Sequence, residues 1–506
     1  MKIGFDSGRY LELQSKAIRE RVGTFGGRLY LEFGGKLCSD SHAARVLPGY
    51  DHKNKIRLLR MLGDLEIVFC ISAKDLQNGT VRQDSGLTYD NQTLKIIDEL
   101  ADQGLRVSSV VITRFEGEPA AEKFRRRLVN LGIGVYTQGV IEGYPRDIDR
   151  VVSEEGYGSL PYVPVESSVV IVTGSGGGSG KMAFCLSQIY HEHRMDQCSG
   201  FAKFETFPIW ELPVDHPVNV AYEAATADLL DEVMVDPFHS EAYGVEAVNY
   251  NRDIENFAIM RSIFERIADR ENSACHYRSP TDMGINAAGR GIVDDGACRD
   301  AGRQEIIRRY FRYREEFLAG LQQKSTIDRM EEIMEKCGLR EEDRRVVLPA
   351  RRAAEEAKYQ EGKGNEGIYC GSALELGDGR IITGKNSPLL HSESAVVLNA
   401  IKELEGIPDG VDLISGEVIR QIGKLKTRTM YERTESLNLN ETLVALAVSA
   451  ARDDIANRAM GKLRELGGCE MHVTHVPTGG DYQALRKLRI NVTTDAIPTM
   501  KRYFAE

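Results

Sequence analysis

The amino-acid sequence predicts an α/β protein with a mostly parallel N-terminal sheet, a helical middle segment and a C-terminal α/β domain. In the first half of the chain, apolar runs rich in β-branched residues alternate with amphipathic segments. Such runs are typical of strands that helices cover on both faces, and right-handed crossovers then produce a doubly wound sheet. The pattern becomes helical between about 250 and 345, and strand signals return after Ile368.

The period of the apolar residues sets the expected elements. LEIVFCIS is a continuous apolar run, whereas DNQTLKIIDELADQ repeats its apolar residues at helical spacing. In the N-terminal sheet we predict strands at 65–72, 106–113, 133–140 and 168–173, and helices at 90–103, 119–131 and 181–193. The expected domains are an α/β phosphate-binding domain at 1–250, a helical segment at 251–349 and an α/β domain at 350–506, the last opening on a polar linker at 350–367.

Composition excludes several classes of protein. The chain has 506 residues, about three domains' worth, and a net charge of 65 − 76 = −11, which disfavours a general nucleic-acid binder. No apolar run is long enough to span a bilayer and the N-terminus has no signal-peptide pattern, so we expect a cytoplasmic protein that binds no membrane. The nine cysteines form no Cys-x-x-Cys pair, which argues against a disulfide framework or zinc ribbon. Large size and an acidic surface favour a homo-oligomer.

A glycine-rich loop, GSGGGSGK, lies between the predicted strand 168–173 and the predicted helix 181–193. Glycines let backbone N–H groups approach a phosphate, and the helix N-terminus adds partial positive charge. Seven consecutive Gly and Ser residues also carry a large entropic cost on ordering, which argues for a compensating role. The predicted ligand-binding residues of the loop are Gly174, Ser175, Gly176, Gly178, Ser179, Gly180 and Lys181.

Two phosphate-binding templates compete for this loop. The P-loop requires Gly-x-x-x-x-Gly-Lys followed by Ser or Thr, but here Ser175 stands at the first glycine and Met182 follows the lysine. Because a thioether is a poor ligand for Mg²⁺, a standard magnesium-assisted NTPase site is disfavoured. The dinucleotide template Gly-x-Gly-x-x-Gly/Ala is satisfied by Gly178, Gly180 and Ala183, with Glu205 at the end of the next predicted strand, FAKFETF, as the ribose acceptor.

Two aspartates of the first half, Asp236 and Asp282, are candidate catalytic residues that orient a substrate or cation. Asp236 follows the segment YEAATADLLDEVMV, and Asp282 precedes a glycine-containing turn. The pattern around Asp236 favours ordinary helix capping and solvation over such a role.

The C-terminal part resembles the cytidine and deoxycytidylate deaminase fold. A hairpin with an Asp378-Gly379 turn is followed by His391-Ser392-Glu393 at a helix start, and 470–495 predicts strand, turn, helix and strand. In such deaminases, the His of His-x-Glu and the two cysteines of a later Pro-Cys-x-x-Cys bind zinc, while the Glu shuttles protons. The resemblance makes His391 and Glu393 candidate catalytic residues.

The second deaminase motif is incomplete in this chain. Pro477 matches its proline, but Thr478 and Asp481 replace the two cysteines. Two soft thiolate ligands are therefore missing, so we expect neither bound zinc nor an intact zinc site. Asp481 with His391 could hold a different metal; the alternative is that His391 and Glu393 only cap a helix.

The whole chain is similar to the uncharacterised bacterial group catalogued as domain of unknown function 1846. The resemblance implies a bacterial, cytoplasmic protein and no particular activity. Some members carry a label of ATP-dependent zinc protease, but this chain has a degenerate P-loop and no His-Glu-x-x-His. The strings that carry the resemblance are RLYLEFGGKL, HAARVLPGYD, FCISAKD, VVITRFEG, FAKFETFPIW, NVAYEAATADL, VNYNRDIE, SPTDMGIN, RQEIIRRYFRY and GKNSPLL.

Three functional hypotheses follow from these patterns. The first is an enzyme acting on a nucleotide or another small phosphorylated metabolite, bound by the glycine-rich loop. The second is a non-catalytic nucleotide sensor or assembly module, favoured by Met182 after the lysine and by the missing cysteines. The third is metal-dependent deaminase or hydrolase chemistry at His391 and Glu393.

Overall fold

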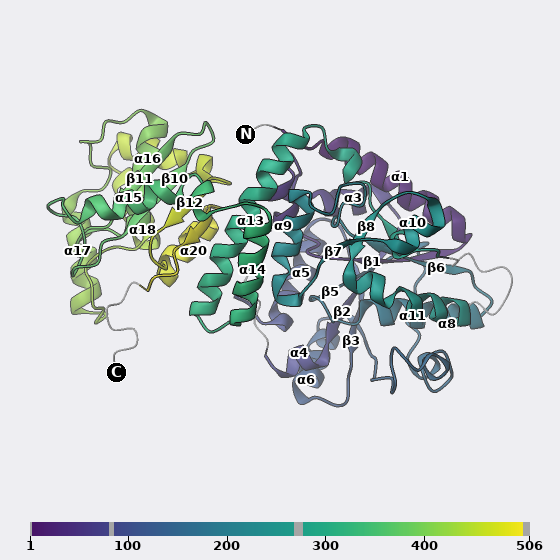
Figure 1. The fold of residues 1–506 in the computed structure, drawn as a ribbon. Coiled ribbons are helices and arrows are strands. Elements are labelled where there is room, and N and C mark those ends of the chain that lie inside the picture. The colour runs from purple at the N-terminus through teal and green to yellow at the C-terminus, as the bar shows by residue number, and fades with distance from the viewer. Residues whose placement is uncertain (1–2, 80–85, 268–276, 499–506) are drawn as a thin grey trace. The chain divides into compact units, whose positions relative to one another are not determined.

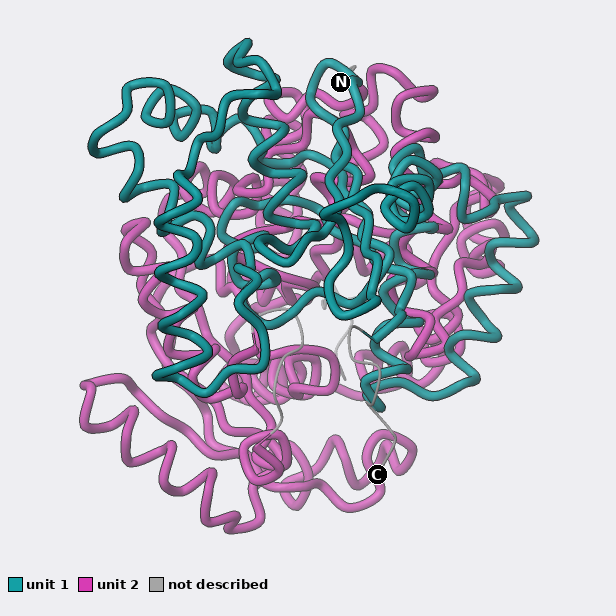
Figure 2. The backbone as a smooth tube through the Cα atoms, turned by 90° about the vertical axis from the view of Figure 1, so that its left-hand side faces the viewer, with its two compact units in different colours: residues 1, 303–506 teal, residues 2–302 magenta. Residues whose placement is uncertain are grey.

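The computed structural model describes residues 3–79, 86–267 and 277–498. The chain divides into two compact units, an N-terminal unit of residues 2–302 and a C-terminal unit of residues 303–506 grouped with residue 1 (Figure 2). None of the helices in the described ranges combines the length and apolar character needed to cross a bilayer.

A seven-stranded, entirely parallel sheet forms the centre of the N-terminal unit (Figure 1). This confirms the predicted parallel α/β sheet. Its strand order is β4-β3-β2-β5-β1-β6-β9. The strands are β1 (Arg28–Phe33), β2 (Glu66–Ser72), β3 (Val107–Thr113), β4 (Gly134–Thr137), β5 (Val169–Gly174), β6 (Ser199–Phe204) and β9 (Gly284–Ile285).

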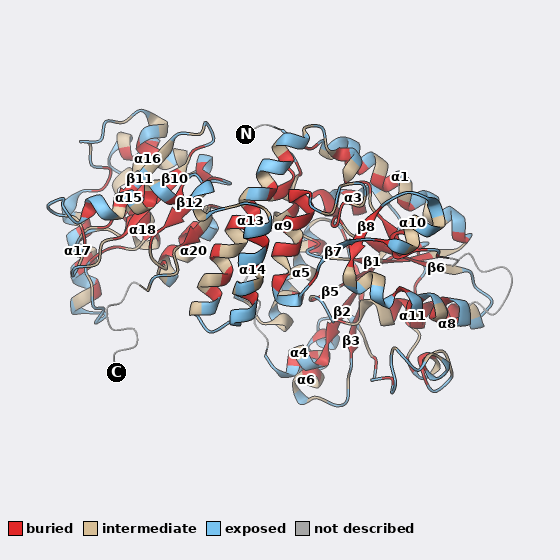
Figure 3. Ribbon diagram, in the orientation of Figure 1, coloured by how far each residue is buried: buried red, intermediate tan, exposed pale blue. Residues whose placement is uncertain are grey.

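Helices cover this sheet, and its central strands are buried (Figure 3). Helix α1 packs with α3, and α8 packs with α11 and against β1, β5 and β6. A short antiparallel pair, β7 (Val233–Val235) and β8 (Val248–Tyr250), lies outside the main sheet. The helices are α1 (Ser7–Phe25), α2 (Ser41–Val46), α3 (Asn54–Leu62), α4 (Ala73–Gln77), α5 (Tyr89–Asp102), α6 (Pro119–Asn130), α7 (Ile148–Val151), α8 (Lys181–Arg194), α9 (Pro217–Ala225), α10 (Pro237–Tyr243), α11 (Asn251–Ile267) and α12 (Pro280–Met283).

The predicted helices and strands of this unit agree with the structure within one residue, except at β4. The expected strand 133–140 is paired only over Gly134–Thr137. Its partner in the sheet is β3, which ends at Thr113. Gln138 still bonds through its backbone to Ile112 and Phe115, and the strand pairing of the described chain ends there.

A topological switch point lies between the adjacent strands β2 and β5. From β2 the chain continues to β3 on one side, whereas from β5 it continues through α8 to β6 on the other side. In open parallel sheets, ligands bind beyond the carboxyl ends of the strands at such a point. The glycine-rich loop follows β5 directly, so the fold places it at this position.

The C-terminal unit contains a four-stranded mixed sheet in the order β11-β10-β12-β13. Strand β10 is antiparallel to β11 and β12, and β12 is parallel to β13. The strands are β10 (Gly371–Glu375), β11 (Ile381–Lys385), β12 (Glu470–Val473) and β13 (Asn491–Thr494). The helices are α13 (Asp295–Leu318), which begins in the N-terminal unit, α14 (Lys324–Lys336), α15 (Val347–Ala357), α16 (Ser392–Glu405), α17 (Gly416–Arg428), α18 (Leu439–Ala450), α19 (Asp454–Gly461) and α20 (Gly479–Lys487).

Sequence reasoning was wrong about the first part of the linker at 350–367. Residues 347–357 form α15, whose Ala350, Ala353 and Ala357 are buried at helical spacing. Helix α15 packs closely on β10. The approach is so close that a Cβ at Gly371 would lie 2.2 Å from the Ala350 carbonyl oxygen. Small residues on both elements allow this contact, and composition alone did not reveal it.

Candidate functional site

The glycine-rich loop is a tightly built turn. A Cβ at Gly174 would lie 2.6 Å from the Cys70 carbonyl oxygen of the neighbouring strand β2. Gly180 has φ +84°, which favours glycine, and a Cβ there would lie 2.8 Å from the Thr113 side chain. The Thr113 hydroxyl donates to the Ser179 carbonyl oxygen at 2.9 Å. Contacts from β2 and β3 therefore fix the path of the loop.

Lys181 is the first residue of α8 and its side chain folds back over the loop. Its Nζ donates to the Gly176 carbonyl oxygen at 3.3 Å and lies 3.7 Å from Oε1 of Glu32, on β1. The two charged side chains are only 13% and 14% exposed. The first N–H groups of a helix have no intrahelical acceptor, so α8 adds donors and partial positive charge beside this lysine.

Two further side chains flank the loop, and sequence reasoning missed both. A Cβ at Gly176 would lie 3.3 Å from the Tyr89 hydroxyl, and one at Gly178 would lie 3.9 Å from Nη2 of Arg114. Arg114 directly follows β3 and is exposed, with φ +53°, an uncommon backbone conformation outside glycine. Its place after a predicted strand was the available signal, because the carboxyl ends of parallel strands share one edge.

Glu205 also lies at this edge, directly after β6. A Cβ at Gly34, just beyond β1, would lie 3.1 Å from the Glu205 Cγ. Burial, together with the charges of Asp253 and Glu32, raises the pKa of Glu205 to about 7, although Lys203 and Lys181 oppose this change. The structure thus brings the predicted ribose acceptor into electrostatic range of the loop lysine.

Asp236 and Asp282 are used as local structural groups. Asp236 is the N-cap of α10, where it accepts from the His239 amide at 3.1 Å and from the Thr281 hydroxyl at 2.7 Å. Asp282 lies in α12 and accepts from the Tyr243 hydroxyl at 2.6 Å. Their partners among the described residues do not include the loop at 174–181.

In the C-terminal unit, the predicted His391 and Glu393 meet Asp481. His391 is the N-cap of α16 and Asp481 lies in the first turn of α20. His391 Nδ1 and Asp481 Oδ2 are 2.8 Å apart, and one ligand atom from each of the three side chains lies within 4.8 Å of the others. Asp481 already accepts from the Thr478 hydroxyl at 2.6 Å and from the Leu439 amide at 2.6 Å.

This set of donors does not fit a zinc site of the deaminase kind. Thr478 and Asp481, which the sequence resemblance aligns with the two deaminase thiolates, supply no sulfur ligand, and both oxygens of Asp481 are engaged in hydrogen bonds. The arrangement instead makes Asp481 a group that orients the imidazole of His391. Burial raises the pKa of Glu393 to about 8, with a further contribution from the negative charge of Asp481.

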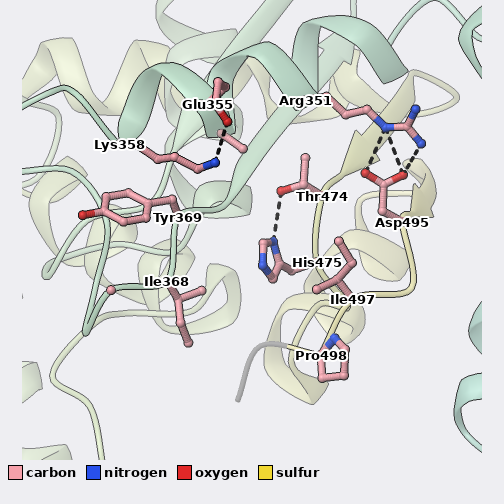
Figure 4. Close-up of a pocket in the computed structure, with 12 residues that line it drawn as sticks. Arg351, Glu355, Lys358, Ile368, Tyr369, Thr474, His475, Asp495, Ile497 and Pro498 are labelled. Atoms are coloured by element: carbon pink, nitrogen blue, oxygen red, sulfur yellow. Dashed lines mark hydrogen bonds and ion pairs between the residues drawn. The ribbon is translucent and has the colours of Figure 1, made fainter. Parts of the chain in front are cut away.

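Hollows in the C-terminal unit include two that are lined by polar side chains. One, of about 620 Å³, is lined by His391, Glu393 and Asp481 together with Arg433 and Cys370. The other, of about 470 Å³, lies beside α15 and the end of β13 (Figure 4). Its charged groups are paired with each other: Arg351 binds Asp495, and Lys358 binds Glu355. The larger hollow therefore has more polar groups available to bind a ligand.

Comparisons with known proteins cover both units. The family model described as "Domain of unknown function DUF1846, N-terminal" matches residues 3–338, and its C-terminal counterpart matches residues 342–504. A UPF0371 protein of Clostridium botulinum (strain Eklund 17B / Type B) is 49% identical over 496 residues, which are 98% of each chain. A UPF0371 protein of Clostridium tetani (strain Massachusetts / E88) is 47% identical over 496 residues, again 98% of each chain.

Proposed function

The chain belongs to the DUF1846 family over both of its units, and we propose that its N-terminal unit binds the phosphate of a nucleotide or another small phosphorylated metabolite at the loop 174–181. The observation that carries this proposal is the position of the loop. It lies at the switch point of a parallel sheet, at the N-terminus of α8, with Lys181 and Arg114 beside it.

The contacts of Lys181 indicate how a phosphate is received. In the structure its ammonium group is held by the Gly176 carbonyl and by Glu32. A phosphate above the loop provides a stronger acceptor than a neutral carbonyl, so Lys181 turns from Gly176 to the ligand. Arg114, which follows β3 at the same edge of the sheet, supplies a planar donor pair that suits phosphate oxygens. In this proposal Glu205 accepts a hydroxyl of the ligand.

The test is a thermal-shift screen of the full chain with ATP, GTP, NAD, NADP, sugar phosphates, pyrophosphate and phosphate. A ligand at 100 times its dissociation constant stabilises the native state by about 2.7 kcal/mol. We expect Lys181→Ala and Arg114→Gln to lose the shift. Lys123→Ala and Arg126→Gln, which remove the same charges from the exposed face of α6, should keep it.

The outcomes separate the hypotheses. A shift that disappears with Lys181 and Arg114 but survives in the α6 controls supports the phosphate site. Turnover of the stabilising ligand indicates an enzyme, and stable binding without turnover indicates a sensor or assembly module. A shift that all four variants retain places the ligand elsewhere and refutes the proposal.

For the C-terminal unit we propose a cytidine-deaminase-like topology without the deaminase zinc site. Support comes from the hairpin β10–β11, the helix start at His391, and the succession β12, α20 and β13. The His391–Asp481 contact also joins the starts of α16 and α20, which carry the two motifs compared above. Elemental analysis of the purified protein tests whether the zinc site is missing. Stoichiometric zinc that disappears in His391→Gln would contradict this part of the proposal.

A further inference from the structure

The larger hollow of the C-terminal unit contains an oriented histidine. Asp481 is fully buried, and its oxygens accept hydrogen bonds from His391, Thr478 and the Leu439 amide. His391 Nδ1 is therefore occupied, while its ring, with a side chain 21% exposed, lines the hollow. Because Nε2 has no protein partner among the described residues, it is the nitrogen available to a ligand. A carboxylate behind Nδ1 also makes the opposite nitrogen more basic.

A second titratable group stands beside this histidine. Glu393 is 5% exposed and accepts from the Ser392 hydroxyl at 3.0 Å, which in turn accepts from the Ser372 hydroxyl at 2.8 Å. Three titratable side chains thus gather at one wall of the hollow. His391 and Asp481 pair with each other, whereas the only side-chain hydrogen-bond partner of Glu393 among the described residues is the Ser392 hydroxyl. Burying a carboxyl group without a cationic partner is costly, so the presence of Glu393 here needs a reason other than packing.

The rim of the same hollow carries an unpaired cation. Arg433 lines the hollow and is exposed, and its guanidinium has no hydrogen-bond or ion-pair partner in the described part of the chain. Glu366 also lines the rim, which disfavours a large polyanion. Ile368 and Cys370 add an apolar stretch of wall, and the volume of about 620 Å³ suits a metabolite-sized ligand.

We propose that this hollow is a second ligand site, separate from the glycine-rich loop, for a compact organic anion. Arg433 binds the carboxylate or phosphate group of the ligand, and Nε2 of His391 contacts a polar group of its body. Asp481 is a positioning residue, because it acts on the ligand only through the orientation and charge of His391. This inference does not depend on phosphate binding at residues 174–181.

The test measures the reactivity of His391 in the full-length protein. Diethyl pyrocarbonate modifies a free imidazole nitrogen, and peptide mass mapping reports the rate at His391 alone. Two probes are used: malonate represents a carboxylate ligand, and inorganic phosphate represents a phosphorylated one. A probe at about ten times its dissociation constant leaves about one site in eleven free, so the rate at His391 falls about tenfold. His193, at the end of α8, serves as an internal reference for reagent strength.

The variant Arg433→Gln should weaken the affinity for each probe by about tenfold or more, because it removes a charge-assisted hydrogen bond. The same probe concentration should then slow the modification of His391 by about twofold at most. Arg428→Gln, at the end of α17 and outside the hollow, removes the same charge. In this variant the probes should protect His391 as they do in the wild type. Protection by malonate alone identifies a carboxylate ligand, and protection by phosphate alone identifies a phosphorylated one. Absence of protection by both probes, or equal protection in Arg433→Gln, overturns the proposal. Circular dichroism of each variant confirms that it is folded.

Discussion

Replacing Gly180 with alanine should destabilise the N-terminal unit by about 2–3 kcal/mol. An alanine at φ +84° costs about 1–2 kcal/mol relative to a right-handed conformation. Its Cβ would lie 2.8 Å from Thr113, so the threonine must move. That movement breaks the hydrogen bond from Thr113 to the Ser179 carbonyl oxygen, which contributes about 1 kcal/mol.

Urea unfolding followed by the fluorescence of Trp210 measures this change. Trp210 is the single tryptophan of the chain and belongs to the N-terminal unit, so its signal reports on that unit. For an m value of about 2–3 kcal/mol/M, the midpoint should fall by about 1 M.

Gly177→Ala is the matched control within the same loop. A Cβ at Gly177 meets no atom within 4 Å, and its φ lies outside the left-handed region, so stability should change by less than about 0.5 kcal/mol. If a phosphate lies against the loop backbone, this variant should nevertheless bind the ligand less tightly. Equal midpoints for Gly180→Ala and Gly177→Ala would refute the argument that β3 fixes the loop.

Three further predictions concern titration. Burial and nearby carboxylates raise the pKa of Glu205 from 4.5 to about 7, so the N-terminal unit should lose stability as pH rises through that interval. The loss is at most about 3 kcal/mol, and it should be absent in Glu205→Gln. Urea unfolding followed by the fluorescence of Trp210 measures it. In the C-terminal unit, two arginines outweigh burial and lower the pKa of Glu470 to about 2. Stability should therefore fall as pH drops from 4.5 toward 2, and Glu470→Gln should flatten that acid limb in circular dichroism. The hydrogen bond and charge of Asp481 raise the pKa of His391 against the opposing effect of burial. Asp481→Asn should therefore lower the pKa of His391 and shift the pH profile of its modification by diethyl pyrocarbonate to lower pH. An unchanged profile would contradict the positioning role of Asp481.

Local pattern determined much of the architecture. Continuous apolar runs predicted β2, β3 and β5 because a strand covered on both faces needs apolar side chains on both sides. Glycines and the following helical period located the loop at 174–181, and the Asp378-Gly379 turn located the hairpin of the second sheet. These features depend on neighbouring residues, so the sequence contains their full signal.

Contacts between distant segments were decided only by the tertiary structure. The strand order β3-β2-β5-β1 brings Arg114, after β3, and Glu32, on β1, to the loop although they are far from it in sequence. Asp481 reaches His391 across 90 residues, and Arg433 lines the same hollow from a separate segment. Hydrophobic periodicity specifies which face of an element is buried, but not which element covers it. Partners of a charged side chain therefore emerge only once the sheet order and helix packing are fixed.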